Sequence, residues 1–114
     1  MSQNENDSQA IVVLITAANA EEATRLAETM VEERLAACVQ ILPEMLSIYY
    51  WKGEVQRDRE VLLLVKTARA RFVDLENRMR EMHTYETPEI IALPVTAASE
   101  PYLNWLMSTT GAIK

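Results

Sequence analysis

The spacing of apolar residues changes several times along the chain, and each change marks a predicted element. Residues 11–17 (IVVLITA) form an almost unbroken apolar run, which is typical of a strand buried on both faces. Over residues 20–34 the apolar positions recur every three or four residues and predict an amphipathic helix. Asn19, followed three positions later by Glu22, has the pattern of a capping box at the start of that helix.

The centre of the chain predicts a long hairpin with a turn at Lys52-Gly53. Apolar residues alternate with other residues along 36–51, but the phase of the alternation shifts near Pro43-Glu44, as it does at a β-bulge. With roughly 13–15 residues at about 3.3 Å each, an arm extends roughly 45–50 Å. A domain of this size has a radius of gyration of about 13 Å, so we expect the tip to project beyond the body.

The second half of the chain predicts a helix, a strand and a last short helix. Thr67 is expected to cap the helix, which should end near residues 83–85. Residues 89–95 (EIIALPV) predict the strand, and Ser99-Glu100-Pro101 opens the last helix. The resulting order is β-α-β-β-α-β and then α, an α+β ferredoxin-like sandwich with a long bulged hairpin. Right-handed crossovers should place both main helices on one face of the sheet.

Length and charge restrict the organisation and the partners. We expect one domain at residues 10–108, with short tails at 1–9 and 109–114. The net charge is −6 and no long basic run is present, so nucleic acid and anionic membranes are poor partners. The first residues lack an apolar signal segment and Cys38 is the single cysteine, which favours a cytoplasmic location.

The segment VLLLV, residues 61–65, predicts self-association. Its apolar residues alternate between both faces of the sheet, yet the two main helices cover one face only. Leu62 and Leu64 therefore need another cover, and a closed symmetric oligomer would supply it. The alternative is that the last helix covers part of this face.

Several segments together resemble the CutA divalent-cation tolerance family over about residues 11–106. They are VVLITA, ERLAACVQILPEMLSIYYWKGEV, LLLVKT, YETPEIIALPV and YLNWL. The resemblance implies a cytoplasmic homotrimer with its hairpins packed between subunits and a link to copper or another divalent metal. The implied trimer is similar to PII signalling proteins, which bind small effectors in clefts between subunits.

The resemblance also implies a copper site, of which this chain matches one position. Some family members carry a cysteine in the first strand and a histidine pair after the second helix. Ile15 and Met82 stand at two of those positions here, and only His83 matches. Met79, Met82 and His83 share one helical face, and thioether with imidazole suits Cu(I), with Glu86 as a possible neighbour. The alternative, which we favour, is that the methionines fill the core.

A ligand cleft is the second candidate site, formed by Trp51, Lys66, Thr67, Tyr85 and Glu89. Lys66 precedes an expected helix start, and a cation beside a helix N-terminus predicts a small anion as ligand. Alternatively, Lys66 only lays its stem over the sheet, and Trp51 packs in a subunit interface.

Enzyme chemistry receives little support from the sequence. The chain has no Ser-His-Asp pattern, HExxH, CxxC or glycine-rich phosphate loop, so we expect a protein that is not an enzyme. Two functions follow: a metal-tolerance trimer that binds metal weakly near subunit clefts, or a PII-like trimeric scaffold with an anion-binding cleft.

Overall fold

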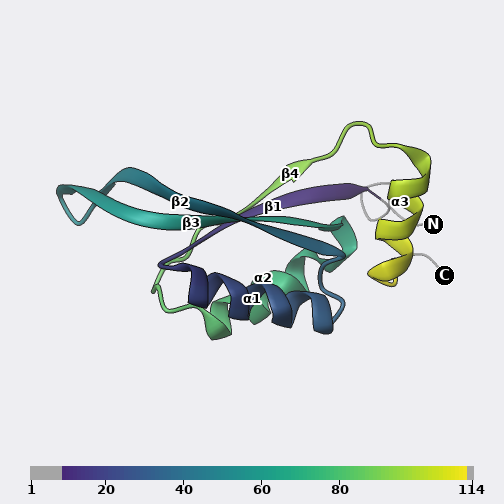
Figure 1. Cartoon of the computed structure of the whole chain (residues 1–114), viewed down its shortest axis with the longest axis horizontal. Coiled ribbons are helices and arrows are strands. Elements are labelled where there is room, and N and C mark those ends of the chain that lie inside the picture. Colours follow the sequence, from purple (N-terminus) through teal and green to yellow (C-terminus); the bar gives the residue numbers. More distant parts are fainter. Residues whose placement is uncertain (1–8, 113–114) are drawn as a thin grey trace.

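The computed structural model describes residues 9–112 and confirms the predicted order of elements (Figure 1). Four strands and two helices follow one another in the order β-α-β-β-α-β, and a third helix comes after the last strand. The elements are β1 (Ala10–Ala17), α1 (Ala20–Glu32), β2 (Cys38–Trp51), β3 (Glu54–Ala68), the 3₁₀ turn η2 (Arg69–Arg71), α2 (Phe72–Met82), β4 (Ile90–Pro94) and α3 (Glu100–Thr109).

The four strands form one antiparallel sheet in the order β2-β3-β1-β4, the ferredoxin-like arrangement. Both α1 and α2 cover the same face, as Figure 1 shows, and α3 lies at the end of the sheet where β1 begins. The core forms between the sheet and the two helices. Its fully buried side chains include Val13, Ile15, Leu26, Met30, Leu63, Val65, Leu75 and Met79.

The hairpin of β2 and β3 projects beyond the helices, as expected, and the molecule is 47 Å long. A bulge lies where the phase shift predicts it. Leu42 pairs with Leu62, whereas Met45, three positions later, pairs with Glu60, only two positions before Leu62. The extra residue reverses the alternation, so Tyr49 lies on the same sheet face as Leu62.

The predicted helix cap at Thr67 is wrong. β3 continues to Ala68, and Thr67 pairs with Ile11 of β1. Its side chain is fully buried and donates a hydrogen bond of 2.7 Å to the Leu35 carbonyl oxygen. Pairing with β1 therefore extends the strand past the residue that the local sequence suggests as a cap, and α2 begins at Phe72.

The sheet face away from α1 and α2, which we call the open face, is only partly covered by α3. Leu106 and Met107 of α3 pack against Ala10 and Ala68 at the end of the sheet. Leu62 and Leu64 remain half-buried on the open face, and Ile91 and Leu93 of β4 are exposed. The alternative cover by the last helix therefore accounts for one end of the face.

Two arginines hold the end of α3. Arg71 Nε donates to the Thr110 carbonyl oxygen at 2.7 Å, and an Arg34 guanidinium nitrogen donates to the Thr109 carbonyl oxygen at 3.3 Å. Thr110 is buried, so packed structure continues beyond residue 108, the expected end of the domain. The expected tails fall largely on residues 1–8 and 113–114, outside the described residues.

Candidate functional site

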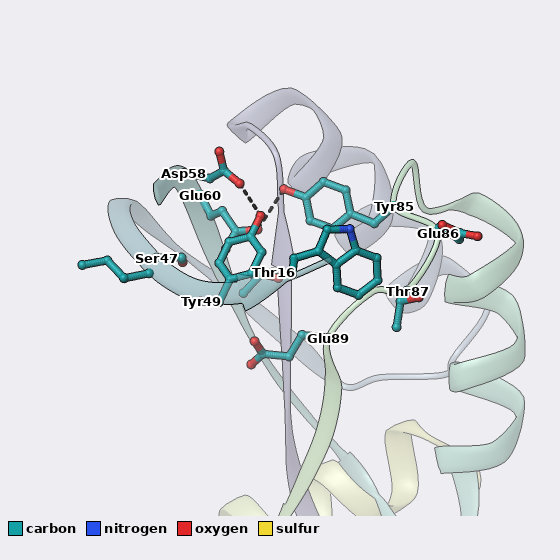
Figure 2. A pocket seen from close by; sticks show the side chains of 11 residues that line it. Thr16, Ser47, Tyr49, Asp58, Glu60, Tyr85, Glu86, Thr87 and Glu89 are labelled. Atoms are coloured by element: carbon teal, nitrogen blue, oxygen red, sulfur yellow. Dashed lines mark hydrogen bonds between the residues drawn. The ribbon is translucent and has the colours of Figure 1, made fainter. Parts of the chain in front are cut away.

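A cavity of about 600 Å³ lies between the projecting part of the hairpin and the loop between α2 and β4 (Figure 2). Its lining combines aromatic rings with carboxylates and hydroxyl groups. The residues are Thr16, Ser47, Ile48, Tyr49, Trp51, Asp58, Glu60, Tyr85, Glu86, Thr87 and Glu89.

His83 attaches the α2–β4 loop to the sheet. Its Nε2 lies 2.7 Å from the Thr16 carbonyl oxygen, and its Nδ1 lies 3.0 Å from the Tyr85 amide nitrogen. A carbonyl can only accept and an amide N–H can only donate, so Nε2 carries the proton and Nδ1 accepts. These contacts therefore define the neutral Nε2–H tautomer, with both ring nitrogens engaged.

Glu22 attaches the same loop to the start of α1. Its carboxylate accepts from the Ala18 amide at 3.1 Å and from the Thr84 amide at 2.9 Å, and it lies 3.7 Å from His83 Nδ1. Burial alone would raise the pKa of Glu22, but the Thr84 and Ala18 hydrogen bonds leave it below the ordinary value. The expected capping box forms in part, since Asn19 caps the Glu22 amide while the Glu22 carboxylate binds Ala18.

Two tyrosines donate to carboxylates in the cavity wall, as Figure 2 shows. The Tyr85 hydroxyl donates to Glu60 Oε2 at 2.8 Å, and the Tyr49 hydroxyl donates to Asp58. Burial and the bond to Glu60 raise the pKa of Tyr85, and the bond to Asp58 raises the pKa of Tyr49. Both phenols therefore stay protonated at neutral pH and orient the carboxylates that they contact.

The cavity is strongly acidic. Asp58, Glu60, Glu86 and Glu89 line it, and its lining includes no lysine, arginine or histidine. Glu89 lies below the Tyr49 ring in Figure 2, whereas Glu86 points outward at the rim. Burial, and then the charge of Glu60, raise the pKa of Glu89. A positive ligand would relieve this repulsion, so the electrostatics of the cavity favour a cation.

Three of the five residues proposed for a ligand cleft come together here: Trp51, Tyr85 and Glu89. Lys66 is six residues from Glu60 along β3, about 20 Å away, and bonds to Gln40. Thr67 faces the helix layer. The cation and the helix N-terminus that suggested an anion are therefore both absent from the cavity lining.

The residues proposed for a copper site occupy separate environments. Met79 is fully buried in the core and Met82 packs against it, as the core interpretation of the methionines expects. His83 would have to give up one of its two hydrogen bonds to bind a metal ion. Within residues 9–112, no group of three or more His, Cys, Asp or Glu side chains is placed to hold one.

Thr16, Asp58 and Glu60 are site residues that the sequence reasoning missed, whereas Tyr49 was considered as a stacking residue with interface packing favoured. Regular alternation along β3 could have indicated Asp58 and Glu60, which share the face of Leu62, and the bulge places Tyr49 on the same face. No local sequence pattern indicates Thr16. It becomes part of the cavity only because the α2–β4 loop folds over the end of β1.

The fold and the cavity together define a ferredoxin-like domain with an extended hairpin and an acidic cavity beside it. Residues 11–109 match the family model of the CutA1 divalent ion tolerance protein, and the chain belongs to this family. It is 51% identical over 100 residues to the divalent-cation tolerance protein CutA of Thermus thermophilus, covering 88% of this chain and 97% of that protein.

Solved structures and a plant relative agree with this assignment. The T. thermophilus Cut A1 structure superimposes with a TM-score of 0.88 at 50% identity, covering 90% of this chain and 99% of that one. The chloroplastic CutA of Arabidopsis thaliana is 42% identical over 110 residues, 96% of this chain, which spans 60% of the plant protein.

The location of this chain stays a prediction. One relative is named chloroplastic, and an Archaeoglobus fulgidus structure with a TM-score of 0.86 is named periplasmic. Among the described residues, no helix has the length and apolar character needed to cross a membrane.

Proposed function

We propose that this chain acts in divalent-cation tolerance as a homotrimer that attracts metal ions weakly and reversibly to the acidic cavity, whose carboxylates form no preformed ligand set among the described residues. The observation that carries the proposal is the lining, which has four carboxylates and no basic side chain. The names of the relatives, divalent-cation tolerance proteins, support the same ligand class. A cavity of this charge does not favour the anionic effector of the alternative scaffold function.

The carboxylates differ in their availability. Asp58 and Glu60 each accept a tyrosine hydroxyl, whereas Glu86 and Glu89 make no side-chain hydrogen bond with the described part of the chain. Carboxylate oxygens are hard ligands and do not favour soft copper ions. We therefore expect the affinities to follow the general order for divalent first-row metal ions, with Cu(II) above Zn(II). Because the pKa of Glu89 is raised, metal binding should tighten as the pH rises through that pKa.

Calorimetric titration with Cu(II), Zn(II) and Mg(II) tests this site. We expect the Glu86→Gln/Glu89→Gln variant to weaken binding about tenfold or more, which is about 1.4 kcal/mol. Glu28→Gln/Glu32→Gln is the matched control, because it removes two exposed charges from α1. An equal loss of metal affinity in the two double variants would show that the net negative charge of the chain attracts the metal ion. A loss of affinity in His83→Ala alone would assign the metal ion to the imidazole.

The homotrimer is supported by the open face and the projecting hairpin. Leu62 and Leu64 are half-buried, Ile91 and Leu93 are exposed, and a two-stranded projection is marginal in water without a partner. Light scattering should give three times 13.0 kDa. Leu64→Asp should lower the mass toward that of one chain. A monomeric parent protein would contradict the proposal.

A further inference from the structure

The cavity has more space and more aromatic surface than a metal ion uses. Its volume of about 600 Å³ falls within the range of small-molecule sites. The rings of Tyr49, Trp51 and Tyr85 line it, and aromatic faces attract organic cations. These walls suit a ligand that carries an apolar body as well as a positive charge.

The floor of the cavity holds polar groups without a protein partner. Thr16 is 4% exposed and lines the cavity, and its hydroxyl makes no hydrogen bond with any residue between 9 and 112. Every fully enclosed side-chain oxygen or nitrogen in this part of the chain has a partner. The Thr16 hydroxyl therefore opens onto the cavity, where a ligand can reach it.

Glu60 is a buried carboxylate beside this hydroxyl. It is 7% exposed, and Thr16 pairs with Leu62, two residues along β3, so both side chains share one sheet face. One Glu60 oxygen accepts from Tyr85, and no basic side chain of the described residues lies within ion-pair distance. A buried carboxylate without a cation is unfavourable, so this position favours a positive group.

We infer that the cavity binds an organic primary amine, with its ammonium group between Thr16, Glu60 and Glu89 and its alkyl chain against the aromatic rings. An ammonium group has three N–H donors, which matches these three acceptors. The alkyl chain can pack on the rings of Tyr49 and Trp51, and the faces of the same rings attract the positive charge. The inference deepens the proposed function, since it uses the same acidic cavity and names a second class of cation for it.

Fluorescence of Trp51 provides a direct test with spermidine as the probe. The chain has two tryptophans, so Trp105→Phe leaves Trp51, which lines the cavity, as the reporter. We expect a saturable change with spermidine and none with 1,4-butanediol, which keeps the four-carbon segment of spermidine but has hydroxyl groups in place of amines. No saturable change with spermidine would overturn the inference.

Two substitutions separate this inference from the metal site. Thr16→Val removes a hydroxyl that has no protein partner in the described structure, so the fold should persist. Thr16→Val and Trp51→Leu, measured by calorimetry, should each weaken spermidine binding about fivefold or more and weaken Zn(II) binding by a smaller factor. Glu89→Gln should weaken both ligands.

The outcomes are distinguishable. Spermidine binding that is equal in the parent, Thr16→Val and Trp51→Leu proteins, or reduced equally by Glu28→Gln/Glu32→Gln, would show attraction by net charge and overturn the inference. Zinc binding without spermidine binding would overturn the inference and leave the proposed function intact. If neither zinc nor spermidine binds, both the inference and the proposed function are overturned.

Discussion

The imidazole of His83 binds the carbonyl oxygen of Thr16, with Nε2 2.7 Å from that oxygen. The pairing of β1 with β4 ends at Ile15–Ile90, so a side chain contacts the next carbonyl of β1 beyond the last strand pair. The loop that carries Glu86 and Glu89 is thereby held against the end of the sheet. The one histidine of the chain thus positions the cavity wall.

His83→Ala should lower the free energy of unfolding by about 1–3 kcal/mol, because it leaves the Thr16 carbonyl and the Tyr85 amide without their partner. Urea denaturation at neutral pH measures the loss. Asn77→Ala, at an exposed position of α2, is the control and should change stability by less than about 0.5 kcal/mol. Equal effects of the two substitutions would contradict the structural role of His83.

Glu22→Gln should destabilise the fold in a pH-dependent way. The folded-state pKa of Glu22 lies below its ordinary value of 4.5, so its stabilising effect is complete above 4.5 and disappears as the pH falls through the lowered value. Denaturation curves of the variant and the parent should therefore converge in acid. A difference that stays constant at low pH would show that another property of the substitution causes it.

Glu89→Gln should have the opposite sign. The folded-state pKa of Glu89 is raised, so ionised Glu89 opposes folding above that value, and the opposition vanishes below the ordinary 4.5. Without ligand, the variant should therefore be more stable than the parent at neutral pH and equal to it in acid. Thermal denaturation at several pH values measures this difference. Lower stability of the variant at neutral pH would contradict the repulsion between Glu89 and Glu60.

Arg71→Ala should loosen α3. Arg71 Nε donates to the Thr110 carbonyl oxygen at 2.7 Å, and the loss of a charged donor of this kind costs about 1.5–3 kcal/mol. Hydrogen exchange should become faster in α3 and stay unchanged in the α1 amides. Arg69→Ala, whose side chain is exposed, is the control. Unchanged exchange in α3 would show that Leu106 and Met107 hold the helix without the arginine.

Local patterns predicted the elements well because the sheet and helices follow apolar spacing. The phase shift near Pro43 located the bulge, and the spacing of Met79 and Met82 placed them in or against the core. The start of α2 was missed because Thr67 takes its conformation from pairing with Ile11, far away in the sequence. Local propensity cannot register such a contact.

The site was less predictable because its parts are joined by contacts between distant segments. Tyr85 meets Glu60 from a different element, and Glu22 reaches Thr84 across a sequence separation of 62 residues. The charge of the cavity follows from these contacts. Lys66 suggested an anion because it stands before a helix in the sequence, yet its place in the sheet removes it from the cavity.

The bulge between Leu42 and Met45 decides which hairpin side chains reach the cavity. Its extra residue puts Met45 on the face of Leu62, and Tyr49 and Trp51 follow Met45 at even spacing on that face. Deleting one residue at 43–44 would remove the bulge and keep Met45 opposite Glu60, so the aromatic wall would stay in place. Deleting one residue between Met45 and Tyr49 would instead turn Tyr49 and Trp51 to the opposite face together, whereas a substitution changes one side chain at a time. The cavity therefore tolerates a shorter β2 before Met45 and not after it.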